Sequence, residues 1–219
     1  MTLWTEPPFT FCTGASITYA SRMARPRKFQ EQAVLDAAQR EFWSTGYRGT
    51  SIDDIATATG LGKGSLYGAF GDKHQLFLRV FDRYCSAVTA QARHALSGPD
   101  EDAAARLKSY VGQVADDTAS DAQHRGCLLA KGVAELAEHD PTVLTRSQQT
   151  FAALEEVLTE TVSAAQRHGD VDSTPAAADL ALLLLAVLRG IEALGKAGED
   201  PDRITRIAAT ALAVTARRA

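Results

Sequence analysis

A short polar segment with the sequence KGSLYGAF carries side chains that could contact nucleic acid. Folded as a helix, it would turn Leu66 and Phe70 inward, one turn apart, and leave Lys63, Ser65 and Tyr67 outward. A glycine inside a helix costs about 1 kcal/mol relative to alanine, but it lets the backbone approach a duplex closely. Lys63 can neutralise a phosphate, Ser65 can reach a phosphate or a base edge, and Tyr67 can donate to a phosphate. The segment therefore predicts a helix that binds DNA.

A second segment, His124-Arg125-Gly126-Cys127-Leu128, holds a cysteine that could be reactive. A thiol at the start of a helix and beside a positive charge has a lowered pKa, and its thiolate is attacked by peroxides and electrophiles. This favours a thiol-based redox or electrophile sensor, and the alternative is an inert cysteine packed in a core. A remote third interpretation is a Cys-dependent enzyme with His124 as the base. Because neither an orienting acid or amide nor an oxyanion loop can be discerned, we expect no catalytic residues.

The cysteines Cys12, Cys85 and Cys127 have neither the number nor the spacing of a zinc site or a disulfide framework. We therefore expect reduced thiols, a cytoplasmic protein, and no metal or cofactor. The longest apolar run, residues 180–188, is much shorter than the ~20 residues that span a bilayer, so no membrane partner is expected.

Three helices are expected to position the polar segment. Residues 30–45 have apolar side chains at helical spacing, and Gly46 suits the end of that helix. A second helix is expected over residues 51–59, and the turn Gly60-Leu61-Gly62 separates it from a third over residues 63–70. Two helices joined by a short glycine-containing turn form a helix-turn-helix, whose second helix enters the major groove of DNA.

Later breaks in the pattern look like helix caps. Asp72 would cap a long helix, and Asp140-Pro141, Thr174-Pro175 and Asp200-Pro201 each place a capping residue before a proline at the first helical position. The expected helices cover residues 72–96, 102–118, 127–139, 141–168, 175–197 and 201–217. Because no strand pattern is found and aromatic residues make up only 7% of the chain, the expected fold class is all-α, with about nine helices.

The stretch VLDAAQREFWSTGYRGTSIDDIATATGLGKGSLYGAFGDKHQLF resembles the DNA-binding domain of the TetR/AcrR family of regulators. The features that carry the resemblance occur in a fixed order: Phe42, Gly46-Tyr47, Thr50-Ser51, Ile55-Ala56, the glycine turn, Leu66-Tyr67, Phe70 and Lys73. The resemblance implies a homodimer on a palindromic double-stranded operator. It also implies a C-terminal helical domain that dimerises and binds a small-molecule effector of unknown identity. We therefore expect a repressor that its effector releases from DNA.

The resemblance further implies that six residues contact DNA: Thr50, Ser51, Lys63, Ser65, Tyr67 and Lys73. We add Gly64, on the outward face of the same helix, and Arg25 and Arg27 from a basic cluster before the first helix. That cluster is either a disordered tail or an arm that reaches the minor groove or phosphates. Many members of the family have a histidine where this chain has Gly68, so we expect no contact there. A similar Gly-Cys-Leu segment occurs in some TetR-like regulators that sense reactive electrophiles.

The expected domains are an extension with a basic arm (residues 1–28), a helix-turn-helix domain (29–75), and a helical ligand-binding and dimerisation domain (76–219). The net charge of the whole chain is −4, which is unusual for a nucleic-acid binder. Residues 22–73, however, carry eight Lys or Arg and six Asp or Glu, and this local excess of +2 favours the division. Residues 1–22 show no helical pattern and Met23 reads like a natural start, so we expect no folded role for them.

Two C-terminal segments are apolar enough to form an interface between subunits. Residues 180–188 are apolar on every side and must be covered on every side, and the last helix has an apolar stripe. We expect a four-helix dimer interface formed by Leu185, Leu188, Ile204, Ala208 and Leu212, whereas the alternative is the core of a monomer. The candidate effector-pocket residues are Tyr110, Val114, Cys127, Phe151, Leu154 and Leu184, each of which also suits a core.

Overall fold

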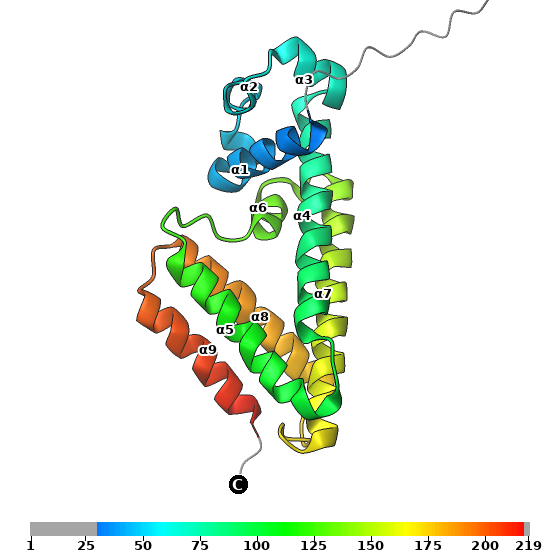
Figure 1. The fold of residues 1–219 in the computed structure, drawn as a ribbon, viewed down its shortest axis with the longest axis vertical. Helices are drawn as coiled ribbons and strands as arrows, with labels where there is room; N and C mark the ends of the chain where they lie inside the picture. Colours follow the sequence, from blue (N-terminus) through cyan, green and yellow to red (C-terminus); the bar gives the residue numbers. More distant parts are fainter. Residues whose placement is uncertain (1–29, 217–219) are drawn as a thin grey trace, which may run out of the picture.

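The computed structural model describes residues 30–216. Within this range the chain forms nine α-helices and one 3-10 helix, and no strand (Figure 1). The helices are α1 (Glu31–Gly49), α2 (Ile52–Thr59), α3 (Lys63–Phe70), α4 (Lys73–Leu96), α5 (Ala103–Ser120), α6 (Leu128–Leu136), α7 (Pro141–His168), α8 (Ala177–Lys196) and α9 (Pro201–Thr215). The 3-10 helix η1 (Asp100–Asp102) precedes α5. The expected all-α class is confirmed for the described residues, and none of their helices is long and apolar enough to cross a bilayer.

The first three helices pack at one end of the molecule, around the N-terminal part of the long helix α4 (Figure 1). Ser51 and Asp54 form a capping box that starts α2, and Asp72 with Gln75 forms another that starts α4. Gly60 ends α2 in the left-handed conformation, with φ of 67°. These local signals fix the boundaries that the sequence predicts for α2 and α3.

The sequence predicts that the first helix ends at Gly46; α1 instead continues to Gly49, but its backbone leaves the helical region at Gly46, with φ of 81° and ψ of 177°. A Cβ atom at this position would lie 2.0 Å from the Glu135 carboxylate. The side chain of Glu135, in turn, accepts a hydrogen bond from the backbone N–H of Arg48 at 2.7 Å. Glycine suits this position because its φ and ψ are strained for any residue with a Cβ atom, whereas the Glu135 carboxylate is the end of a flexible side chain that can move aside.

The remaining helices form a bundle in which α4 runs alongside α7, and α5, α8 and α9 lie together (Figure 1). Two apolar clusters fill the molecule. One joins α1–α3 to the first half of α4, to Cys127–Leu129 and to Val143. The other joins α5, α7, α8 and α9 to the second half of α4. The packing of the first three helices therefore extends beyond residue 75, along α4 and onto α6.

Two of the three expected proline caps are confirmed. The Asp140 carboxylate accepts from the backbone N–H groups of Thr142 and Val143, and Asp200 does the same for the start of α9. The prediction for Thr174-Pro175 is wrong, because α8 begins at Ala177. The Gln166 side chain donates to the carbonyls of Asp172 and Pro175 and so holds this segment as a loop. Helix α6 is also shorter than expected at both ends, and Cys127 lies at its N-cap.

Candidate nucleic-acid interface and internal cavity

Helix α3 presents a small polar surface, as the sequence predicts. Leu66 and Phe70 are buried and anchor the helix to the core. Tyr67 is 50% exposed, which is unusual for so large an aromatic side chain in the absence of a partner. A Cβ atom added at Gly64 or Gly68 would meet nothing within 4 Å, so packing within the subunit does not require either glycine. The outer face of α3 is thus free of bulky side chains except for Tyr67.

Lys63, at the first position of α3, pairs with Asp53 of α2. Its Nζ lies 2.7 Å from an Asp53 carboxylate oxygen, and both side chains are more than half exposed. The hydrogen bond and the charge of Asp53 raise the pKa of Lys63, so the ammonium stays charged. Because an exposed ion pair contributes little stability, Lys63 can exchange this partner for a phosphate at small cost.

Thr50 and Lys73, which the sequence also predicts to contact DNA, have partners within the subunit and lie apart from this exposed surface. Thr50 is buried, and its hydroxyl donates to the Gly46 carbonyl at 2.7 Å. The Lys73 Nζ donates to the carbonyls of Tyr47 and Thr50 at 3.0 Å each and lies 4.2 Å from the centre of the Tyr47 ring. Both side chains brace the end of α1. Ser51 remains exposed but serves as the cap of α2, while Arg25 and Arg27 lie outside the described residues.

We expect Lys73→Ala to act mainly on stability. The change removes two hydrogen bonds from a charged donor and a cation–π contact, which together contribute about 2 kcal/mol. The melting temperature should fall by roughly 4–8 °C for a chain of this size. Lys63→Ala is the matched control and should leave melting unchanged, because its ion pair is exposed. Equal melting temperatures for the two variants would contradict the bracing role of Lys73.

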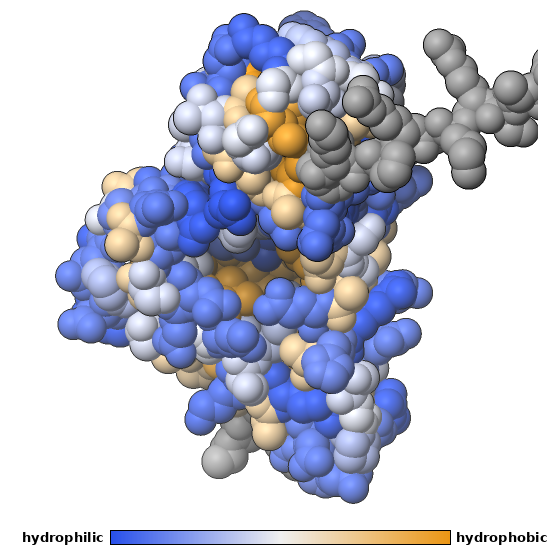
Figure 2. All heavy atoms as spheres, turned by 45° about the horizontal axis from the view of Figure 1, so that its top comes forward, coloured by the Kyte–Doolittle hydropathy of each residue, from blue (hydrophilic) through white to orange (hydrophobic). Residues whose placement is uncertain are grey.

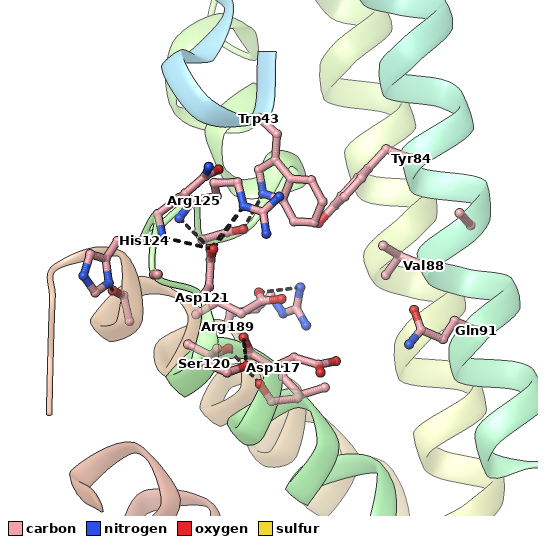
Figure 3. A pocket seen from close by; sticks show the side chains of 18 of the residues that line it. Trp43, Tyr84, Val88, Gln91, Asp117, Ser120, Asp121, His124, Arg125 and Arg189 are labelled. Atoms are coloured by element: carbon pink, nitrogen blue, oxygen red, sulfur yellow. Dashed lines mark hydrogen bonds and ion pairs between the residues drawn. The ribbon is translucent and has the colours of Figure 1, made fainter. Parts of the chain in front are cut away.

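A cavity of about 770 Å³, open to the surface, lies between α1, α4, α5, α8 and the loop that precedes α6. It opens on the face shown in Figure 2, where the surface is hollowed, with apolar residues at the bottom and hydrophilic ones around the rim. Its size is typical of sites for small organic ligands. In Figure 3, Trp43 reaches the cavity from α1, while Tyr84, Val88 and Gln91 face it from α4.

The sequence identified only part of this cavity. Tyr110 and Val114 line it, but Leu154 and Leu184 are buried in the core behind it. Phe151 packs against the apolar cluster that joins α1–α3 to the first half of α4, and neither Phe151 nor Cys127 lines the cavity. The charged lining residues that the sequence reasoning missed are Asp117, Asp121, Arg125, Arg189 and Glu192. One signal was available, because Arg189 and Glu192 come directly after the apolar run of residues 180–188.

Cys127 lies behind the cavity wall, in surroundings that favour the thiol over the thiolate. Its Sγ is 3.4 Å from Arg189 Nη1 and 3.7 Å from the Tyr84 hydroxyl. Burial raises the pKa of the Cys127 thiol, the nearby Glu192 raises it further, and Arg189 only partly opposes them. The expectation of a lowered pKa is therefore wrong. A nucleophile–base pair is not formed either, since His124 Nδ1 lies 3.1 Å from the Gly195 carbonyl instead.

We expect Cys127 to react slowly with iodoacetamide in the native protein. A raised pKa leaves less thiolate at any pH below it, so the alkylation rate should keep increasing with pH beyond the range in which a free cysteine has levelled off. Mass spectrometry of the peptide that contains Cys127 gives the rate, and the denatured protein is the reference. Equal rates for the native and the denatured protein near pH 8 would contradict this environment.

An apolar groove runs between α8 and α9 on the outside of the bundle. Leu183, Val187, Ile207, Ala211 and Val214 line it, with Arg203, Arg206 and Thr210 beside them. This changes the expected interface residues. Leu185, Leu188, Ile204 and Ala208 are buried in the subunit's own core, and Leu212 packs partly against it. The apolar residues of α8 are therefore divided between the subunit's core and an exposed face that includes Leu182 and Leu183.

Comparison with known proteins agrees with this geometry. Residues 34–80 match the family described as bacterial regulatory proteins, tetR family, and residues 103–211 match the tetracyclin repressor-like C-terminal domain. The HTH-type transcriptional repressor ComR of Escherichia coli K12 is 27% identical over 188 residues, which cover 86% of this chain and 90% of ComR. An HTH-type regulator from the lacX 3' region of Lactococcus lactis subsp. lactis is 31% identical and matches 61% of this chain and 68% of its own length.

A solved structure of the TetR family regulator CifR, a cysteine mutant complexed with a 26 bp double-stranded operator DNA, has the same fold. Its TM-score is 0.72 at 23% identity, with 88% of this chain and 100% of that chain covered. The fold and the exposed α3 define a helix-turn-helix regulator. The chain belongs to the tetR family of bacterial regulatory proteins and is a DNA-binding transcription regulator.

Proposed function

We propose that the protein is a repressor that binds a palindromic operator as a homodimer and leaves it when a small molecule fills the cavity of about 770 Å³. Residues 29–75 form the DNA-binding domain and residues 76–219 the effector-binding and dimerisation domain. We place it in the cytoplasm, where it reaches the chromosome, and assign it no catalytic activity. ComR is named a transcriptional repressor, and CifR is complexed with operator DNA, which supports this proposal.

The observation that carries the proposal is that the DNA-binding end of the molecule forms part of the cavity wall. Gln39 and Trp43, both on α1, line the cavity. Phe42 of the same helix belongs to one apolar cluster with Ile55 of α2 and Leu66 of α3, the helices that carry the DNA-binding surface. A ligand in the cavity therefore contacts α1 directly. If it fits one arrangement of α1 better than another, the difference in affinity shifts the protein between DNA-binding and non-binding states.

DNA contacts are assigned to the exposed residues of α3 and the start of α2. Lys63 and Tyr67 contact phosphates, Ser65 reaches a phosphate or a base edge, and Gly64 allows the backbone to come close. Ser51 adds a hydroxyl at the start of α2. Two copies of α3 related by a two-fold axis read half-sites about one helical turn, ~10 bp, apart. The groove between α8 and α9 is the face that a second copy covers.

The thiol-sensor alternative is not proposed, because burial raises the pKa of Cys127 and the side chain is only 4% exposed. A reactive sensor cysteine needs both thiolate character and access.

Capture of genomic fragments by the purified protein tests the proposal. We expect a small set of fragments that share an inverted repeat, and gel-shift titration on the repeat should show one dimer bound. Small molecules related to the products of the neighbouring genes should then be tested for release. Binding without sequence preference, or no binding at all, would contradict operator recognition, and the lack of any releasing compound would contradict effector control.

A further inference from the structure

The loop that joins α5 to α6 holds one of its own side chains on the cavity wall. The Arg125 guanidinium lies 4.6 Å from the centre of the Trp43 ring, and its Nε donates to the Asp121 carboxylate at 3.1 Å. Trp43 Nε1 donates to the carbonyl of Gly126 at 2.6 Å, so the same loop is also tied to α1. A planar cation thus already rests on an aromatic ring, beside a carboxylate that neutralises it, at the edge of the cavity (Figure 3).

The charges that line the cavity favour a cation over an anion. Its carboxylates are Asp117, Asp121 and Glu192, and its guanidiniums are Arg125 and Arg189. Arg125 pairs with Asp121, and Arg189 pairs with Glu192 at 2.8 Å. Asp117, which is exposed, has no cationic partner among residues 30–216, so the lining carries one negative charge in excess when Arg189 and Glu192 are both ionised. An anionic ligand would meet this excess charge while its own polar groups lose water.

The aromatic walls favour a flat ligand. Trp43 and Tyr84 lie edge to face with 5.4 Å between their ring centres, and Tyr110 adds a third ring from α5. We propose that the cavity binds a flat aromatic cation, which replaces the Arg125 guanidinium on Trp43 and beside Asp121. The inference rests on the effector-controlled repressor described above and names its ligand class.

Replacement of Arg125 gives a direct route from the ligand to α1. The guanidinium holds the loop of residues 121–126 against Trp43, and the Gly126 carbonyl accepts from the same tryptophan. Just beyond the loop, the Lys131 Nζ donates to the carbonyls of Trp43 and Ser44. A ligand that displaces Arg125 removes one of these ties between the loop and α1. The position of α1, and with it that of α3, then depends on whether the cavity is filled.

Three compounds of one shape and different charge test the ligand class: naphthalene-2-carboxamidine, a cation; naphthalene-2-carboxamide, which is neutral; and naphthalene-2-carboxylate, an anion. Calorimetry on the full-length protein should show that the amidine binds at least about fivefold more tightly than the amide, and that the carboxylate binds most weakly.

Asp117→Asn should reduce amidine affinity about fivefold. Asp116→Asn is the matched control, since Asp116 is an exposed neighbour on α5 that does not line the cavity. Tighter binding of the carboxylate, or equal effects of the two variants, would overturn the proposal.

Arg125→Ala separates displacement from simple contact. If Arg125 competes with the ligand, its removal should strengthen amidine binding severalfold, whereas a side chain that helps to hold the ligand would weaken binding when removed. Arg93→Ala is the control, because Arg93 pairs at the surface with Glu156 and does not line the cavity.

Gel shifts on captured operator DNA distinguish the possible failures. The amidine, and not the carboxylate, should release the operator. If the unliganded protein does not bind operator DNA, the proposed function itself is refuted. Intact DNA binding without amidine binding would refute only the ligand class, and amidine binding without release would refute the route through Trp43.

Discussion

Leu183→Glu should convert the dimer to monomers and abolish operator binding. Leu183 is 44% exposed in the single subunit and lines the groove between α8 and α9. In a two-fold interface both copies of the glutamate would be buried near each other without a partner. Removing unpaired carboxylates from water costs several kcal/mol, so the dimer should weaken by at least about a hundredfold. Sedimentation at micromolar concentration and gel shifts on the operator measure the two effects.

The matched control is Leu144→Glu, a leucine on α7 that is 40% exposed and does not line this groove. It should leave the dimer and operator affinity unchanged. Because both leucines are partly exposed, neither change should unfold the subunit, and the circular dichroism spectra should match. A stable Leu183→Glu dimer with normal affinity would move the interface to another face.

Lys63→Ala should weaken operator binding by about tenfold or more and lower its salt dependence. Each lost phosphate contact reduces the slope of log affinity against log salt by about 1, so a dimer should lose about 2. Lys108→Ala, on the exposed side of α5, is the control and should change neither quantity. An unchanged slope in Lys63→Ala would show that this lysine does not reach a phosphate.

Asp53→Asn should strengthen operator binding, which is the opposite of the effect expected for Lys63→Ala. It removes the carboxylate that lies 2.7 Å from Lys63 Nζ, so the ammonium no longer has to leave an ion pair when it meets DNA. It also removes a negative charge near the phosphates. Affinity should increase severalfold at low salt, with the difference shrinking as salt screens the charges. Weaker binding by Asp53→Asn would indicate that Asp53 positions Lys63 rather than competing for it.

The DNA-binding end of the molecule could be predicted from the sequence because its signals are local. The capping pairs Ser51–Asp54 and Asp72–Gln75 are three residues apart, and the inward positions Leu66 and Phe70 are one helical turn apart. Interactions over such short separations depend little on the rest of the fold. The proline caps after Asp140 and Asp200 were predictable for the same reason, whereas the Thr174 cap failed because Gln166 holds that segment from another helix.

Side-chain roles that depend on contacts between segments far apart in the sequence could be seen only in the tertiary structure. Lys73 looks like a surface lysine in the sequence, but the carbonyls that it caps belong to a turn more than twenty residues earlier. Cys127 sits at a helix start beside an arginine, and only its burial against Tyr84 shows that its pKa is raised. The apolar run of residues 180–188 predicts that every face of this helix is covered, but the sequence does not show whether the subunit's own helices or a partner subunit cover each face. The positions of α5, α7 and α9 determine which leucines fill the subunit's core and which remain for a partner.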